Sequence, residues 1–314
     1  MKKVLLIILV ITAMLIVLVS CNNDEGLLYI PDDSYHSEDC VASACTCGGS
    51  NNYVLRSSGV KDATPPLDKD RMTEYSLNGI NYKLVYRFSD RMGLDNYTQD
   101  VYAACHPDSD LGNYKEERTF DVWYSRDIGK VIGIYIPLDR GFEKGFCLDR
   151  MESTNPTEEE LKEFAKEKAI QFVKEYELDF NIAECVLSLE PSSSDCFYIF
   201  TKCINCIPTC EYLRVDIAYD GRYLGAQAVN YGIFKSFENS KIDTESIKSY
   251  VGDYKSITLY NDYGTLVARV EYEVTYERPP LDTSFINGKP APNETVTERY
   301  TKYIPLVPKE IEKE

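Results

Sequence analysis

The chain has 314 residues, of which 51 are acidic and 34 are basic, so its formal net charge is -17 at pH 7. This charge argues against nucleic acid or an anionic membrane surface as the main partner, because both are negatively charged and repel acidic proteins. Apolar residues make up 44% of the chain, which is enough for a sizeable core, and the length predicts one or two domains.

Residues 1–20 have the features of an export signal. Lys2 and Lys3 precede an apolar run from Val4 to Val19 that is interrupted only at Thr12. This run is shorter than the roughly 20 apolar residues that a membrane-spanning helix needs, and it fits the apolar part of a signal peptide. An uncleaved anchor helix is the alternative interpretation. Both interpretations predict that the bulk of the chain is exported.

The run ends in Leu18-Val19-Ser20-Cys21, which resembles the lipobox of bacterial lipoproteins. The resemblance implies cleavage before Cys21 and attachment of palmitate or a similar acyl group to that cysteine. Two or three acyl chains hold a protein stably on a membrane, whereas one chain binds only marginally. The predicted location is therefore the extracytoplasmic face of the cell membrane, with the membrane itself as a partner through the lipid on Cys21.

Residues 21–70 are predicted to be a flexible spacer. They are polar and rich in turn-forming residues, including Gly48-Gly49-Ser50-Asn51-Asn52 and Pro65-Pro66, and such compositions form little fixed structure. Such a spacer would hold a folded ectodomain away from the membrane.

The chain contains 11 cysteines, and setting Cys21 aside leaves an even number, which favours disulfides in an exported protein. Zinc is the rival interpretation, because Cys203-Ile-Asn-Cys206 has metal-ligand spacing and Cys210 follows closely. Disulfides are favoured, since four zinc ligands are needed and only two histidines exist. A Cys203–Cys210 bond is the preferred pairing, because these residues flank a short connection between two strand-like runs.

Residues 71–149 are predicted to form a small β-rich domain. Thr73–Leu77 and Ile80–Phe88 are strand-like runs joined by Asn78-Gly79, the dipeptide that two-residue hairpin turns prefer. A second hairpin is predicted from Thr119–Tyr124 and Lys130–Ile136.

Residues 150–314 are predicted to form an α+β domain. Thr157 with Glu160 has the pattern of a helix N-cap and capping box. Apolar residues then recur at three- and four-residue steps to Tyr176, which predicts one long amphipathic helix. The strands expected after it are Ala183–Leu189, Cys196–Cys203, Cys210–Tyr219, Arg222–Val229, Leu266–Tyr276 and Thr295–Ile304.

The predicted fold class is thus α+β: a long helix packed on an antiparallel sheet, preceded by a small β-rich unit and a flexible spacer. The capped helix, the Phe197–Phe200 strand and the Val215–Arg222 segment resemble PepSY-like modules of exported bacterial proteins over residues 157–234. The resemblance implies a PepSY/cystatin-like arrangement and a non-catalytic domain that binds or inhibits secreted enzymes.

No catalytic residue, cofactor or resident metal is predicted. His36 lies in the spacer, so a nucleophilic triad would need His106, and no Gly-x-Ser-x-Gly motif supplies a serine. Cys105 beside His106 is more consistent with half of a disulfide than with a thiol nucleophile. The chain also contains no nucleotide-binding glycine motif.

Asp108-Ser109-Asp110-Leu111-Gly112-Asn113 resembles the opening of a calcium loop, and Asp108, Asp110 and Glu116 form a candidate calcium site. Gly112 and Thr119 occupy positions where an EF-hand has acidic or amide ligands. An ordinary solvated loop is therefore preferred over a calcium site.

The sequence favours a non-catalytic ectodomain that binds another secreted or envelope protein or a peptide, and no nucleic acid. A carboxylate-dependent extracytoplasmic hydrolase and a structural envelope component are the alternatives. Binding predicts an exposed sheet face or edge, whereas hydrolysis predicts a cleft that holds two carboxylates, one with a shifted pKa.

Overall fold

The computed structural model describes residues 27–29, 61–62, 64–92, 97–137, 146–153, 155–262, 264–278, 285–286, 289–290 and 293–308. The predicted signal segment 1–20, Cys21 and most of the predicted spacer lie outside these residues. Within them, no helix is both long enough and apolar enough to cross a membrane.

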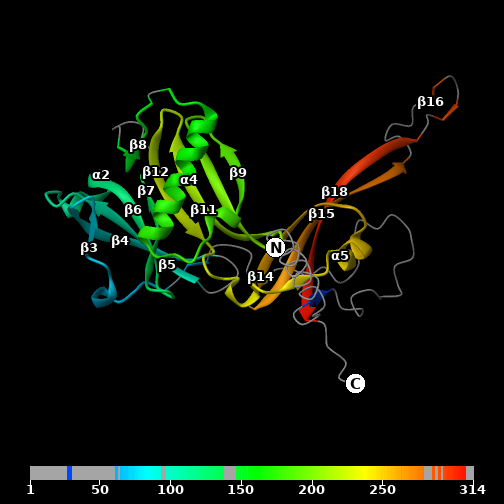
Figure 1. The fold of residues 1–314 in the computed structure, drawn as a ribbon, viewed down its shortest axis with the longest axis horizontal. Coiled ribbons are helices and arrows are strands. Elements are labelled where there is room, and N and C mark those ends of the chain that lie inside the picture. The colour runs from blue at the N-terminus through cyan, green and yellow to red at the C-terminus, as the bar shows by residue number, and fades with distance from the viewer. Residues whose placement is uncertain are drawn as a thin grey trace, which may run out of the picture.

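The first lobe is built on one antiparallel sheet (Figure 1). Its strands run in the spatial order β2-β4-β5-β6-β7-β12-β11-β10-β9, with β3 beside β4 and β8 beside β12. Their bounds are β2 Lys61–Asp62, β3 Glu74–Leu77, β4 Ile80–Met92, β5 Tyr97–Cys105, β6 Arg118–Ser125, β7 Lys130–Tyr135, β8 Asp149–Arg150, β9 Val186–Pro191, β10 Asp195–Ile204, β11 Ile207–Ala218 and β12 Arg222–Val229.

The second lobe is built on a smaller sheet, whose strands run in the spatial order β13-β1-β18-β15-β14. Its strands are β1 Leu27–Tyr29, β13 Lys241–Ile242, β14 Tyr254–Asp262, β15 Thr265–Arg278 and β18 Glu294–Pro308, with a separate pair β16 Phe285–Ile286 and β17 Lys289–Pro290. The helices of both lobes are α2 Tyr114–Glu117, α4 Glu158–Glu175 and α5 Thr244–Val251, with 3-10 turns η2 Asp68–Asp70, η3 Leu111–Asn113, η4 Ile182–Glu184 and η5 Lys235–Phe237.

The predicted fold class, a long helix packed on an antiparallel sheet of the PepSY/cystatin-like kind, is wrong. The protein is mostly a large mixed β-sheet, with parallel pairing between β11 and β14 and between β1 and β13. The sheet also continues across the expected boundary at residue 149, because β12 pairs with both β7 and β8. Local patterns identified the hairpins, but they carry no information about pairing between strands that are distant in sequence.

The two hairpins predicted in residues 71–149 are confirmed. Leu77 pairs with Ile80 across the Asn78-Gly79 turn, in which both residues have positive φ, and Ser125 pairs with Lys130 at the start of the second hairpin. A positive φ at both turn positions is the conformation for which Asn-Gly is preferred.

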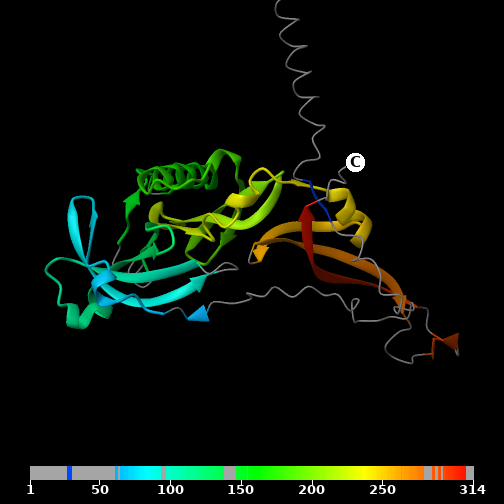
Figure 2. The same cartoon turned by 90° about the horizontal axis from the view of Figure 1, so that it is seen from below.

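Helix α4 begins where the sequence predicts. The Thr157 hydroxyl accepts a hydrogen bond from Glu160 N at 3.3 Å, and Glu160 Oε2 accepts one from Thr157 N at 2.7 Å, so both halves of the capping box are present. The helix lies along one face of the first sheet (Figure 2). It buries Leu161, Ala165 and Phe172 in the first core.

Strand β11 belongs to both sheets. Followed backward from Ala218, β11 pairs with β10 as far as Tyr212. The register then shifts, so that Cys203 lies opposite Pro208. The three residues 209–211 have no cross-strand partner on β10 and turn β11 toward the second lobe, where Thr209 pairs in parallel with Leu259 of β14. Among the described strands, the pairing of β11 with β14 is the one that joins the two sheets.

The second lobe has its own core around α5 and ends in a long two-stranded ribbon. Buried residues of this core are Ile204, Ile207, Ile233, Phe234, Ile242, Ile247, Ile257, Leu259, Leu266, Ala268, Val270, Ile304 and Leu306. Beyond Glu273, β18 is the one described strand that pairs with β15, and residues 274–277 are exposed. The ribbon projects away from both lobes in Figure 1.

Replacing Thr157 with alanine is expected to lower the free energy of unfolding by about 1 kcal/mol, because the N-cap hydroxyl that satisfies Glu160 N is lost. Urea denaturation followed by circular dichroism measures this change. Thr295→Ala, at an exposed strand position, is the control. Equal effects of the two substitutions would contradict a capping role for Thr157.

Candidate functional site

Cys105 and His106 do not form a thiol–imidazole catalytic pair, because the thiol is buried and the imidazole is half-exposed. Cys105 is fully buried, its sulfur lies 4.0 Å from Tyr114 O, and burial raises the pKa of the thiol. His106 is half-exposed, with Nδ1 3.6 Å from Asp108 Oδ2. A buried thiol with a raised pKa is a poor nucleophile, because the thiolate is the reactive form.

The residues of the candidate calcium site are engaged locally. Asp110 Oδ1 accepts a hydrogen bond from Gly112 N at 2.9 Å, and Glu116 Oε2 accepts one from Asn113 Nδ2 at 2.7 Å. The Asp108 side chain is 93% exposed. Among the described residues, no group of three or more His, Cys, Asp or Glu side chains is arranged to hold a metal ion.

Cys203 and Cys210 are present as thiols, and no disulfide occurs in the part of the chain that the structure describes. Cys203 lies on β10 opposite Pro208, whereas Cys210 lies within the register shift of β11. The Cys203–Cys210 bond therefore stays a prediction.

Two adjoining cavities lie beside the tip of the β3–β4 hairpin, and Leu77, Asn78 and Leu148 line both. The first has a volume of about 360 Å³ and brings His106 and Glu116 together with Cys147. Its remaining lining residues are Tyr82, Ser109, Glu117, Arg118, Thr119, Phe120, Ile136 and Phe146.

The second cavity, of about 250 Å³, lies between the hairpin and α4. Lys168 faces it with only 6% of its side chain exposed and pairs with Asp149 at 2.5 Å. Hydrogen bonding to Lys168 helps to hold the pKa of Asp149 below its usual value, against the opposing effect of burial. The charge of this lysine is thus already compensated within the protein.

The carboxyl groups with raised pKa values lie elsewhere. Burial and then the neighbouring Asp195 raise the pKa of Asp216 to about 8, and burial raises the pKa of Glu211. Asp195, Asp216 and Glu211 are each at most 1% exposed, and none lines either cavity. Carboxyls this deeply buried have no access to a substrate, so the cleft that the hydrolase hypothesis requires is not found at these groups.

Asp195 and Asp216 are neighbours on the sheet face opposite α4, because Cys196 and Val215 beside them point into the first core. Arg214 and Tyr135 are further polar neighbours of Asp216, and both oppose the rise in its pKa. Neither carboxylate oxygen of Asp216 has a hydrogen bond of good geometry. Two carboxyls held together away from water cannot both ionise readily, so the pair retains a proton at neutral pH.

Asp216→Asn is expected to change how stability depends on pH. The folded-state pKa of about 8 lies above the unfolded value of 3.8, so between these values the unfolded state binds fewer protons and stability falls as pH rises. Asparagine removes this dependence. As the pH rises from about 5 to about 8, the free energy of unfolding of the wild type should therefore fall relative to that of the variant. The expected difference is on the order of a few kcal/mol, since each pKa unit corresponds to about 1.4 kcal/mol.

Chemical denaturation across that pH range measures the difference, with Asp108→Asn as the exposed control. If wild type and Asp216→Asn show parallel pH profiles, Asp216 does not retain its proton in the folded state.

The first sheet has an open edge at β9, which lies at the right-hand border of the first lobe in Figure 1. Among the described residues, β9 pairs only with β10. Five of its six residues are exposed, and Leu187 is half-buried. An open edge presents unpaired backbone donors and acceptors.

The register of the β9–β10 hairpin shows which backbone groups face outward. Ser192 N donates to Asp195 O at 2.9 Å, so this pair is a hydrogen-bonded one. Hydrogen-bonded and non-hydrogen-bonded pairs alternate along an antiparallel ladder. Leu187, Leu189 and Pro191 therefore occupy non-hydrogen-bonded pairs, and their backbone groups point away from β10. Leu187 and Leu189 offer both N–H and C=O, whereas Pro191 offers only C=O.

Apolar side chains accompany these backbone groups on both faces of β9. Leu189 is 40% exposed on the α4 face, where it lies opposite Tyr198, and Val186 is 52% exposed on the other face. Glu184 and Glu190 are exposed at either end of the strand. Natural edge strands are commonly blunted by lysine, by proline or by an inward-pointing charge, and of these β9 carries only Pro191, at its end.

The sequence predicted a strand at Ala183–Leu189, close to the observed β9, but did not predict its place at the edge of the sheet. Two signals for an edge are present in the sequence: Pro191, because proline favours edge strands, and the mixture of apolar and polar residues in Val-Leu-Ser-Leu.

No known protein family, curated protein or solved structure matches the chain.

Proposed function

We propose that this protein is a membrane-anchored binding module that captures an extended segment of another extracytoplasmic polypeptide at the open edge of β9. The observation that carries the proposal is the pair of outward-facing backbone positions, Leu187 and Leu189, on an exposed strand that has no second neighbour among the described strands. A polypeptide that adds a strand there satisfies these groups, and its alternate side chains determine specificity.

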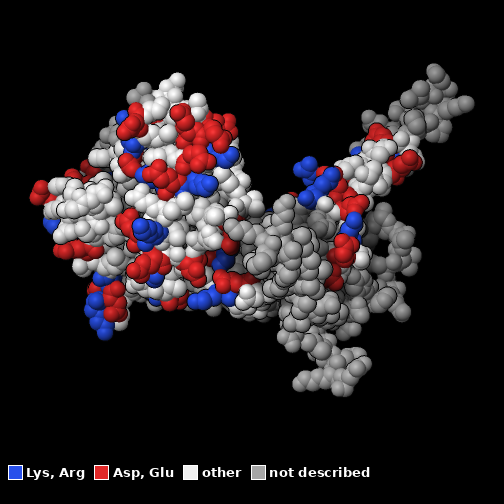
Figure 3. All heavy atoms as spheres, in the orientation of Figure 1, with Lys and Arg blue, Asp and Glu red and all other residues white. Residues whose placement is uncertain are grey.

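The chemistry around β9 indicates the kind of segment that fits. Leu189 and Leu187 favour apolar residues at alternate positions of the incoming strand, because paired strands direct side chains to the same face. Glu184 and Glu190 favour lysine or arginine at its ends. Acidic side chains are spread over the surface shown in Figure 3, which supports a basic rather than an acidic partner.

The proposed anchor is the lipid on Cys21, on the extracytoplasmic face of the cell membrane. An anchored module of this kind raises the local concentration of its partner at the membrane without acting on it chemically.

Leu189→Pro is expected to weaken partner binding about fivefold, because it removes one outward N–H and a net hydrogen bond contributes about 1 kcal/mol. The inward hydrogen bonds to β10 remain, so the fold is retained. Leu189→Lys should weaken binding as well, since it replaces an apolar contact with a charge that natural edges use to prevent pairing. Affinity capture from the extracytoplasmic fraction, with the full chain in detergent, identifies the partner, and titration then measures its affinity.

Val274→Lys is the matched control, because Val274 is 40% exposed, as is Leu189, but lies on the β15–β18 ribbon. A partner that binds wild type and Val274→Lys alike but binds both Leu189 variants more weakly supports strand addition at β9. A partner that binds the Leu189 variants as tightly as the wild type contradicts it.

A further inference from the structure

Two cysteines lie on neighbouring segments near the start of β9. Cys185 terminates the η4 turn, with its N–H bonded to Ile182 O at 3.3 Å, and directly precedes Val186. Val186 pairs with Thr201 of β10. The chain at Cys185 therefore runs alongside the segment that contains Cys203.

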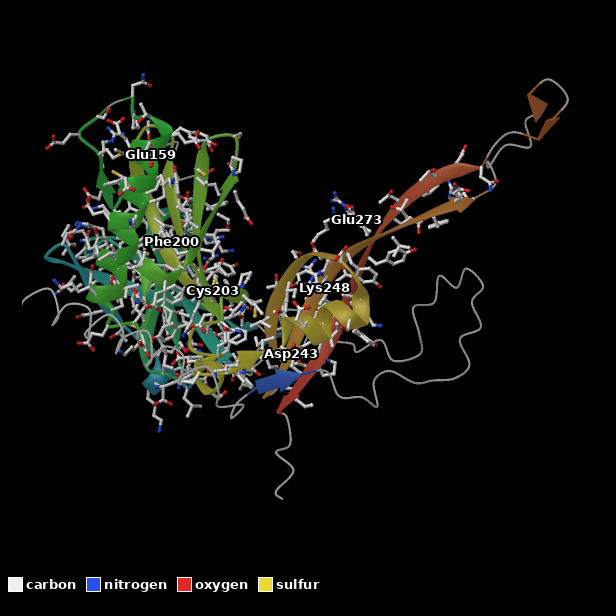
Figure 4. All side chains as sticks on the ribbon, turned by 45° about the vertical axis from the view of Figure 1, so that its right-hand side comes forward. Glu159, Phe200, Cys203, Asp243, Lys248 and Glu273 are labelled. Atoms are coloured by element: carbon white, nitrogen blue, oxygen red, sulfur yellow. The ribbon has the colours of Figure 1, made fainter. Side chains whose placement is uncertain are left out.

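The Cys203 side chain is directed toward β9. Its sulfur lies 3.8 Å from Thr201 O, and Thr201 pairs with Val186 of β9. Val186 directly follows Cys185, so the Cys203 sulfur lies near the backbone of Cys185. Figure 4 shows Cys203 at the end of the first sheet that adjoins the second lobe.

The Cys185 side chain lies close to the same place. Its sulfur donates to Asn181 O at 3.3 Å, and both Cys185 and Cys203 are partly buried. Burial and then the nearby Cys203 thiol raise the pKa of Cys185 to about 12.

The other cysteines near Cys203 are less well placed. Cys206 is exposed in the tight turn between Ile204 and Ile207 and has a positive φ of 63°. Cys210 lies within the register shift of β11, whereas the Cys203 sulfur faces β9.

We propose that Cys203 pairs with Cys185, in place of the Cys210 partner that sequence spacing predicts, in a disulfide that fastens the start of β9 to β10. A small-molecule disulfide such as glutathione disulfide serves as the oxidant. One cysteine thiolate attacks it and releases a first glutathione thiol, and the second cysteine then displaces the other glutathione from the mixed disulfide. The protein loses two hydrogens, and two reduced glutathione molecules form. The proposal does not depend on partner binding at β9.

The raised thiol pKa values make the reaction slow at neutral pH, because thiolate is the attacking form. The full chain in detergent is therefore incubated with glutathione disulfide in mildly alkaline buffer, and free thiols are then blocked. Non-reducing peptide mapping by mass spectrometry locates the bond. Cleavage after Lys174, Lys202 and Arg214 leaves Cys185 with Cys196 in one peptide and Cys203 with Cys206 and Cys210 in the next, so fragmentation of the cross-linked peptides assigns the two bonded cysteines.

The expected product is a Cys185–Cys203 cross-link, with a higher melting temperature that is lost on reduction. Cys185→Ser and Cys203→Ser should each abolish both effects, whereas Cys206→Ser and Cys210→Ser should preserve them.

A cross-link from Cys203 to Cys206 or Cys210, or complete alkylation of Cys185 after oxidation, would overturn the proposal. Because mapping detects the bond directly, a variant that folds poorly does not obscure the result from the wild type.

Discussion

The architecture depends on β11 taking part in two sheets. Antiparallel pairing with β10 and β12 places one part of this strand at the centre of the first lobe, and the shift at residues 209–211 delivers Thr209 to β14. The crossing point is polar and buried. Glu211 is fully buried there, and its Oε1 accepts a hydrogen bond from Gly232 N at 2.8 Å.

A buried carboxylate at the crossing point is costly unless it is compensated. Lys202 lies 4.0 Å from Glu211 and 2.7 Å from Glu238, and Thr209 donates its hydroxyl to Lys202 O at 2.9 Å. These contacts tie the shifted segment to β10 and to the chain that enters the second lobe. The relative position of the two lobes follows from this polar junction together with the single parallel pairing of Thr209 with Leu259.

The junction also determines which edge of the first sheet remains open. Since β11 and β12 are central, the first sheet extends outward to β9 on one side, and α4 lies over one face of that sheet (Figure 2). With β11 at the centre of the first sheet, β9 is therefore left at the border of that sheet. An exposed edge with apolar side chains is a hazard for aggregation unless a partner strand covers it, and this gives the proposed binding role a physical basis.

Features with local causes could be predicted from the sequence. Asn78-Gly79 and the Thr157–Glu160 capping box specify backbone geometry within a few residues, and both were found where predicted. The shift at residues 209–211 and the pairing of β7 with β12 depend on contacts between segments far apart in the chain, which alternation of residue types does not encode. For the same reason the fold class was wrong, and the proximity of Cys185 to Cys203 was not foreseen.

Amide hydrogen exchange of the isolated full chain, resolved by residue with NMR, tests the open edge most directly. The account predicts rapid exchange at Leu187 and Leu189, whose N–H groups face outward, and slow exchange at Ser188 and Glu190, whose N–H groups bond to β10. Equal protection at all four amides would show that another segment already covers β9 and would contradict the proposed binding edge.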